Sequence, residues 1–304
     1  MKSRDVIEWL LLAAVWGASF LFARVAVPEF GAVALVGVRL VVAALVLAVP
    51  LVLAGHLALL RDRWRLFLLV GAINSAIPFT LFAWSLKSLS AGEASVLNAT
   101  AALFAGLIAF AVLGERMSIR RSAGLVVGFV GVILLVWHKL TFSGNVVAIG
   151  AGLLAALLYG IASHIITLRL PGVPPVAVSA GSLGFAALLQ IPLAIASAPT
   201  TMPSAKAWLA ALVLGVVCTA GGYLMYFRLV KNIGPTRAIT VTYGIPVFGI
   251  LWGFLFLHES VSILTLIGGV VIVLGTAMVK LPDRVVRSNA SSSVASDSTP
   301  LVRS

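Results

Sequence analysis

The chain has 304 residues, of which 61% are apolar and only 10% carry a charge, and its mean hydropathy is +1.15. A soluble domain carries about 25% charged residues, so this composition excludes a water-soluble globular protein. The net charge of +12 comes from basic residues that stand singly or in small groups between apolar runs. They form no basic face of the kind that binds nucleic acid.

Ten apolar runs follow one another along the chain, and a helix of about 20 such residues crosses a bilayer. Proline, glycine and charged residues separate the runs, as at Pro28-Glu29 and Pro174-Pro175. The predicted spans are residues 6–26, 31–53, 66–86, 93–113, 119–137, 145–168, 175–196, 207–230, 236–257 and 262–280. We therefore predict an all-α polytopic membrane protein with ten transmembrane helices.

The distribution of Lys and Arg predicts the orientation in the membrane. If the N-terminus is cytoplasmic, 16 of the 21 basic residues fall in cytoplasmic segments and 3 in external loops, while Arg24 and Arg39 lie within spans. Cytoplasmic loops carry the excess of Lys and Arg in membrane proteins, so both termini are predicted to be cytoplasmic. Residues 282–304, rich in Ser and nearly free of apolar runs, are predicted to form a disordered cytoplasmic tail.

The chain also repeats itself. Shifting it by 144 positions aligns acidic, hydroxyl and glycine residues as well as apolar ones: Glu115 with Glu259, Ser118 with Ser262, Gly124 with Gly268 and Gly131 with Gly275. Each half, residues 6–137 and 145–280, holds five predicted spans. Because five is odd, the second half enters the membrane from the opposite side. Inverted repeats of this kind are typical of transporters.

Several short motifs, in two ordered copies, carry a resemblance to a known family. They are Trp16-Gly-Ala-Ser-Phe-Leu-Phe-Ala-Arg24, Arg39-Leu40, Leu97-Asn-Ala-Thr100, Leu113-Gly-Glu-Arg-Met-Ser118, Gly234-Pro235, Tyr243-Gly-Ile-Pro246 and Leu257-His-Glu-Ser260. Over about residues 6–280 the chain resembles the EamA domain of the drug/metabolite transporter superfamily. The resemblance implies a ten-helix secondary-active carrier of small metabolites, with amino-acid export as the best-known activity. Two departures stand out: Ala102 aligns with Pro246, so the first copy should lack a kink, and His258 aligns with Gly114.

Arg39 is the most informative single residue, because it lies about one-third into the second predicted span. An ionised guanidinium at mid-membrane costs roughly 2.5–3.5 kcal/mol on insertion scales. It is therefore a candidate contact for a substrate carboxylate or phosphate, which the planar fork of arginine suits. The alternative is a structural role, either snorkelling to the outer interface or pairing with Glu29 or Glu93.

The other candidate substrate-binding residues are polar or amphipathic side chains in the spans that the resemblance places around a central cavity. They are Trp16, Ser19, Asn74, Asn98, Tyr159, His164, Tyr223 and Tyr243. Binding pockets combine apolar walls with a few polar groups, but hydrogen bonds between helices would equally explain each residue. His164 is also a candidate proton carrier, since the pKa of histidine lies near neutrality.

Three residues are candidates for gating or for a role at helix ends. Glu115 and Glu259 close the fourth and ninth predicted spans at corresponding positions of the repeat, and Pro246 lies in the ninth. Ser118 and Ser262, three residues after the two glutamates, are predicted to cap the following helices, where an acid is also favourable. Two further patterns, Gly124-x-x-x-Gly128 and Gly249-x-x-x-Gly253, predict close helix packing.

Together these features predict a secondary transporter in the cell membrane that moves a small metabolite by alternating access around a midplane cavity. Export of amino acids or related amphipathic compounds is the leading interpretation, and a carrier of nucleotide sugars or other phosphorylated metabolites is the alternative. A membrane enzyme is disfavoured because the four histidines are scattered and no catalytic pair stands out. A channel is also disfavoured, because no filter-like segment is recognisable in the sequence. The expected partners are the substrate, the lipid bilayer and, as an option, a coupling proton. No cofactor, metal or nucleic acid is predicted, and a monomer is favoured.

Overall fold

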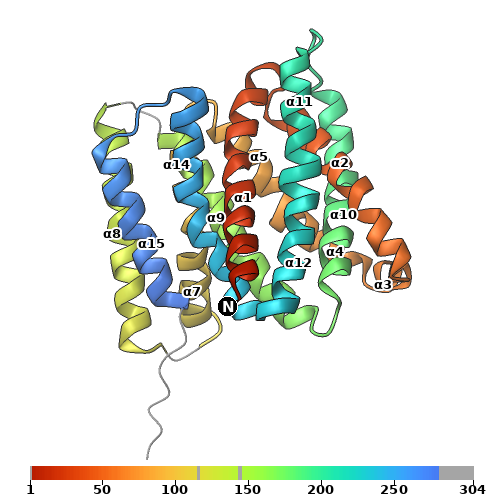
Figure 1. Ribbon diagram of the computed structural model, residues 1–304, viewed down its shortest axis with the longest axis horizontal. Coiled ribbons are helices and arrows are strands. Elements are labelled where there is room, and N and C mark those ends of the chain that lie inside the picture. The colour runs from red at the N-terminus through yellow and green to blue at the C-terminus, as the bar shows by residue number, and fades with distance from the viewer. Residues whose placement is uncertain (1, 115–116, 143–145, 281–304) are drawn as a thin grey trace, which may run out of the picture.

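The structure is a computed structural model that describes residues 2–114, 117–142 and 146–280. Within these residues it is all-helical, and the helices stand side by side as a bundle (Figure 1). Eight helical segments are long and apolar enough to cross a membrane: Ser3–Phe30, Ala32–Leu53, Trp64–Ser85, Ala91–Ala111, Val146–Arg169, Pro175–Ala196, Ala205–Ile233 and Ile239–Leu257.

Four of these segments are single, uninterrupted helices: α1 (Ser3–Phe30), α2 (Ala32–Leu53), α9 (Val146–Arg169) and α10 (Pro175–Ala196). The other four are divided into shorter pieces: α4 (Trp64–Gly71), η1 (Ala72–Ala76) and α5 (Ile77–Ser85); α6 (Ala91–Ala99) and α7 (Ala101–Ala111); α11 (Ala205–Val213), η2 (Leu214–Gly221) and α12 (Gly222–Ile233); η3 (Ile239–Tyr243) and α14 (Gly244–Leu257). Two short helices, α3 (Leu57–Asp62) and α13 (Pro235–Ala238), lie in connections.

The remaining two predicted spans are also helices in the structure. They are α8 (Ile119–Phe142) and α15 (Ile263–Lys280), which lie side by side at one edge of the bundle (Figure 1). Glycines make this close approach possible. A Cβ on Gly275 would lie 2.5 Å from Cα of Gly128 and 2.6 Å from the carbonyl oxygen of Gly124, so the predicted packing role of the first glycine pair is confirmed.

The second glycine pair packs α14 against α6. Gly249 faces Ser95 of α6, and a Cβ added to it would collide with the Ser95 side chain. A Cβ added to Gly253 would collide with the carboxylate of Glu259 and would lie at an ordinary contact distance, 3.6 Å, from Cβ of Ala91. The hydroxyl of Ser95 donates to the carbonyl of Gly92 at 2.7 Å, so the buried polar group in this contact is satisfied. Both predicted glycine patterns are therefore packing contacts inside the bundle.

Helix interruptions fall at corresponding places in the two halves. The π-helical turns η1 and η2 interrupt the third and eighth predicted spans, and η1 shifted by 144 residues falls within η2. The fourth predicted span is interrupted at Thr100, although no proline is present. Thr100 keeps near-helical dihedrals, with φ of −66° and ψ of −15°, and Ala102 lies inside α7, so the expected absence of a proline kink at Ala102 stays a prediction. The Thr100 hydroxyl donates to the carbonyl of Leu97 at 2.6 Å, and this local bond satisfies a backbone carbonyl where the helix is interrupted.

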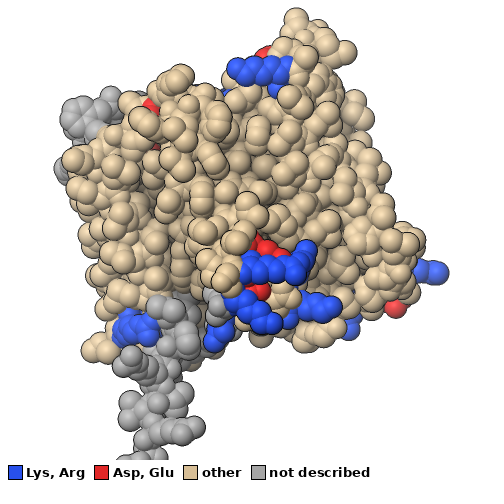
Figure 2. All heavy atoms as spheres, viewed as in Figure 1, with Lys and Arg blue, Asp and Glu red and all other residues tan. Residues whose placement is uncertain are grey.

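Charged side chains gather at the end of the bundle where the chain begins. Figure 2 shows most of the visible Lys and Arg at this end and few at the other. Glu8 near the start of α1 pairs with Arg228 in the last part of α12 at 3.2 Å. The same end carries the connection between α9 and α10, residues 170–174 (Figure 1).

Candidate functional site

A cavity of about 860 Å³ lies between helices of both halves. Its size is within the range of small-molecule sites, about 300–1,000 Å³. Seven of the nine predicted binding residues line it: Trp16, Ser19, Arg39, Asn74, Asn98, Tyr159 and Tyr223. They come from α1, α2, η1, α6, α9 and α12, so segments far apart in the sequence meet around one space.

Arg39 is the only charged residue that lines the cavity within the described part of the chain. Its Nε donates to the hydroxyl of Thr219 at 2.9 Å, and its guanidinium lies over the ring of Phe79, 3.6 Å from the centroid. The Thr219 hydroxyl in turn donates to the carbonyl of Leu214 at 2.7 Å. These contacts fix the orientation of the guanidinium but leave most of its five N–H donors facing the cavity.

The predicted alternative for Arg39, an ion pair with Glu29 or Glu93, is wrong. Glu29 accepts a hydrogen bond from the Ser204 hydroxyl at 2.8 Å and so joins the end of α1 to the start of α11. Glu93 forms a capping box with Ser90 at the start of α6, its carboxylate accepting from the Ser90 backbone at 2.9 Å. Both carboxylates are held by helix ends, because backbone N–H groups there lack partners within the helix.

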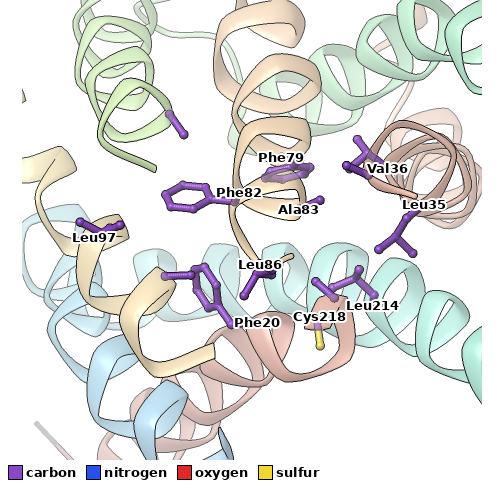
Figure 3. Close-up of a cluster of buried hydrophobic side chains, with 14 of the residues drawn as sticks. Phe20, Leu35, Val36, Phe79, Phe82, Ala83, Leu86, Leu97, Leu214 and Cys218 are labelled. Atoms are coloured by element: carbon purple, nitrogen blue, oxygen red, sulfur yellow. The ribbon is translucent and has the colours of Figure 1, made fainter. Parts of the chain in front are cut away.

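Aromatic rings form much of the cavity wall. Phe82 packs edge-on against Phe20, with ring centroids 5.7 Å apart, and is stacked with Tyr159 at 6.1 Å. Trp16 packs against Tyr223 and Tyr226 at 6.3 and 5.5 Å. Figure 3 shows the apolar part of this wall, where side chains of α1, α2, α5 and η2 point toward one another. Those labelled include Phe20, Leu35, Val36, Phe79, Phe82, Leu86, Leu214 and Cys218.

The cavity is closed at one end and open at the other. At the closed end Leu35, Leu86 and Leu214 are at most 1% exposed. At the other end the lining residues Ser163 and Thr167 of α9 are exposed, and the cavity reaches the connection between α9 and α10. The open end is therefore the end of the bundle where the N-terminus and most basic side chains lie.

Two predicted binding residues do not line the cavity. A ring nitrogen of His164, Nε2, lies 2.8 Å from the carbonyl of Ala105, so this histidine joins α9 to α7. The Tyr243 hydroxyl points to α15, where it donates to the carbonyl of Thr276 at 3.5 Å. Pro246 is buried in the first turn of α14, a position that tolerates proline because its missing N–H has no helical partner.

Glu259 lies at a junction of three helices near the closed end of the cavity. Its carboxylate oxygens accept from the backbone N–H of Ala91 at 3.0 and 3.1 Å, and its Oε1 lies 3.7 Å from Nε of Arg24. Arg24 also donates to the carbonyl of Leu86. Burial raises the pKa of Glu259, the bond from Ala91 and the charge of Arg24 lower it, and the charge of Glu93 raises it; the net shift is upward. Its predicted counterpart Glu115 lies outside the described residues.

The predicted caps are present beside these glutamates. The Ser262 hydroxyl accepts from the backbone N–H of Thr265 at 3.1 Å, and the Ser118 hydroxyl accepts from that of Arg121 at 3.4 Å. The αL backbone at His258, with φ of 52°, corresponds to Gly114, with φ of 68°. The chain therefore turns in the same way at both helix ends, although only one of them has the glycine that this conformation favours.

Sequence reasoning missed several polar lining residues. They are Ser163, Thr167, Ser179, Ser182, Thr219, Tyr226 and Thr242. A signal was available on α9 and α10: Tyr159, Ser163 and Thr167 are spaced by four residues and Ser179 and Ser182 by three, so each set lies on one helix face.

Apolar helices that surround a solute-sized cavity, with Arg39 as its one charged lining residue in the described part of the chain, define a polytopic membrane protein with a pocket of small-molecule size. Comparison with known proteins gives the family. The chain belongs to the EamA-like transporter family, whose model matches residues 6–137 and 146–281. It is a multi-pass transporter of the cell membrane.

Its relatives carry transporter names. The chain is 24% identical to "Uncharacterized transporter YvbV" of Bacillus subtilis over 95% of both chains. It is 28% identical to "Probable terminal-alkyne amino-acid exporter" of Streptantibioticus cattleyicolor over 91% of this chain and 93% of that one. A solved crystal structure covers 92% of this chain and 98% of its own, with a TM-score of 0.65 and 20% identity, and so shares the fold.

Proposed function

We propose that the protein is a secondary carrier that moves a small amphipathic metabolite by alternating access. The observation that carries the proposal is the central cavity, which Arg39 lines and whose described lining residues are exposed at one end and buried at the other. A channel would need a path open at both ends, whereas a carrier exposes its site to one side at a time. In the proposed orientation, with the N-terminus cytoplasmic, this conformation is open to the cytoplasm.

The proposed mechanism rests on two inverted repeats of five spans each, with ten transmembrane helices in all. Helix contacts support this arrangement, because partners repeat with the same offset. The first span, α1, packs on α14 of the ninth, and the sixth span, α9, packs on α7 of the fourth; α2 with α10 and α8 with α15 pair across the two halves. Two halves related in this way can exchange conformations and so move the opening from one side to the other.

Amino acids and related amphipathic compounds are the proposed cargo. The aromatic wall would hold an apolar body and Arg39 a carboxylate, and one relative is named a probable amino-acid exporter. Nucleotide sugars have less support, because their phosphates bring at least two negative charges and Arg39 is the only charged lining residue that the structure describes.

The test is exchange in proteoliposomes that contain the purified protein and a panel of labelled amino acids and carboxylic acids. We expect saturable exchange that is stimulated by unlabelled cargo on the opposite side. Non-saturating flux would indicate a channel. The absence of any saturable flux across the panel would overturn the carrier proposal.

A further inference from the structure

The charge of the cavity is unbalanced. Arg39 has hydroxyl and aromatic neighbours, Thr219 and Phe79, and within the described residues no carboxylate pairs with it. The described acidic residues are engaged elsewhere or lie outside the cavity lining, as Glu29, Glu93 and Glu259 do. A guanidinium at this depth is stabilised when an anion occupies the cavity beside it.

The rest of the lining suits the body of such an anion but not a second cation. The described lining residues include no Asp or Glu that could accept from an ammonium group. Arg39 already covers one face of the Phe79 ring, and the rings of Phe82 and Tyr159 are stacked on each other, so these ring faces are not open to a cation. Neutral groups such as Asn74 and Asn98 provide the remaining hydrogen bonds.

We infer that the cavity selects hydrophobic organic monoanions that lack an ammonium group over zwitterionic amino acids with the same carbon skeleton. A carboxylate on the guanidinium of Arg39 neutralises the cavity with one charge, and an aromatic or branched body fills the apolar wall. In an amino acid the α-ammonium lies next to the carboxylate, so it is brought close to Arg39 without an acidic partner and is repelled by it. This inference rests on the proposed function and narrows its cargo: among the amphipathic compounds proposed above, carboxylates without an ammonium group are the preferred ligands and amino acids the weaker ones.

Two matched series of small molecules test it with the full-length protein in detergent, by equilibrium binding. The first is 3-phenylpropanoate, L-phenylalanine and 2-phenylethylamine, which share a ring and differ only in the carboxylate and the ammonium. The second is 4-methylpentanoate, L-leucine and 3-methylbutylamine. Binding is preferable to flux here because protonated carboxylic acids cross bilayers unaided.

The carboxylates should bind at least about tenfold more tightly than the amino acids, because the ammonium leaves an unpaired charge in the cavity. The amines should show no binding. In Arg39→Gln the preference for the carboxylate should disappear, whereas Arg39→Lys should keep part of it. Arg65→Gln removes an arginine outside the cavity and should leave binding as in the wild type.

Equal or tighter binding of an amino acid or an amine would overturn the inference, as would no binding in either series. So would a carboxylate preference that persists in Arg39→Gln. Arg39→Lys keeps a charge at this position and covers the case in which Arg39→Gln does not fold. The proposed function and this inference can be told apart by their failures. Carboxylates that bind without any saturable exchange would contradict the proposal that the protein is a carrier. Saturable exchange of an amino acid in preference to its carboxylate would contradict only the inferred selectivity.

Discussion

Arg39 and Glu259 differ in how the protein satisfies their charges. Glu259 lies at a helix junction, where the backbone N–H of Ala91 and the charge of Arg24 offset part of the cost of burying its carboxylate. Arg39 faces an open space with one hydroxyl and one ring as neighbours. A charge that is satisfied within the protein favours a structural role, and one that is left facing a cavity favours a ligand.

Glu259 gives a prediction for the effect of pH on stability. Its pKa in the folded protein is raised above the ordinary value of 4.5, because burial disfavours the charged carboxylate. The folded state therefore binds the proton more tightly than the unfolded state, and the stability that this provides is lost as the pH rises through the folded pKa. We expect Glu259→Gln, which stays neutral, to gain thermal stability relative to the wild type as the pH is raised above 4.5. Melting curves of both proteins between pH 4 and pH 8 would measure this, and a constant difference would contradict it.

His258 gives a second prediction at the residue scale. It is the one residue other than glycine with positive φ in the described chain, and its side chain is exposed. A side chain in the αL conformation costs roughly 1–2 kcal/mol. His258→Gly should therefore raise the free energy of unfolding by about 1 kcal/mol, and Gly114→Ala should lower it by a similar amount. Opposite shifts of the thermal midpoint are expected, and shifts of equal sign would show that φ is not the cause.

At the scale of the elements, glycine determines how closely helices approach. The contact of α8 with α15 brings the backbone at Gly275 against Gly124 and Gly128, and that of α14 with α6 depends on Gly249. In a bilayer the lipid is as apolar as the side chains, so close packing rather than burial from water holds helices together.

The packing of α8 on α15 can be tested with one methyl group. Gly275→Ala would place Cβ 2.6 Å from the carbonyl oxygen of Gly124, so the helices must move apart, and overpacking of this kind costs about 1–3 kcal/mol. Gly150→Ala in α9 is the matched control, because no heavy atom lies within 4 Å of its added Cβ. Thermal unfolding should show a loss for the first variant and none for the second. Equal behaviour of the two variants would argue against a tight contact.

At the scale of the whole molecule, the described lining residues are exposed at one end of the cavity and buried at the other. Exposed Ser163 lies at the mouth, and Leu35 is buried at the closed end. The exposed loop residue Thr201 lies between α10 and α11 at the opposite end of the bundle from the mouth. Alternating access with cytoplasmic termini therefore predicts a different accessibility from the two sides of the membrane for each of these three positions.

The accessibility of these three positions can be measured with an impermeant maleimide and single cysteines introduced into a Cys218→Ala background. Ser163→Cys should react in everted vesicles but not in intact cells, and Thr201→Cys should react in intact cells. Leu35→Cys should react from outside only when the cavity opens to that side, and saturating cargo should change its rate. Labelling of Ser163→Cys from outside together with Thr201→Cys from inside would reverse the orientation. A labelling rate for Leu35→Cys that stays the same with and without saturating cargo would contradict alternating access.

The sequence by itself determined the class of protein, the approximate positions of the described helices and the presence of Arg39 within a predicted span. In lipid every backbone polar group must be satisfied within the chain, so long apolar runs have few structures available other than helices. Only the tertiary structure decided which face of each helix lines the cavity. The neighbours Ser163 and His164 illustrate this: the first lines the cavity and the second bonds to α7. Apolar residues occur on every face of each span, so the sequence pattern alone does not show which face of the helix points into the bundle. Nor does sequence show that Ser204, 175 residues away, holds Glu29 and that Arg39 faces the cavity without a carboxylate partner in the described chain.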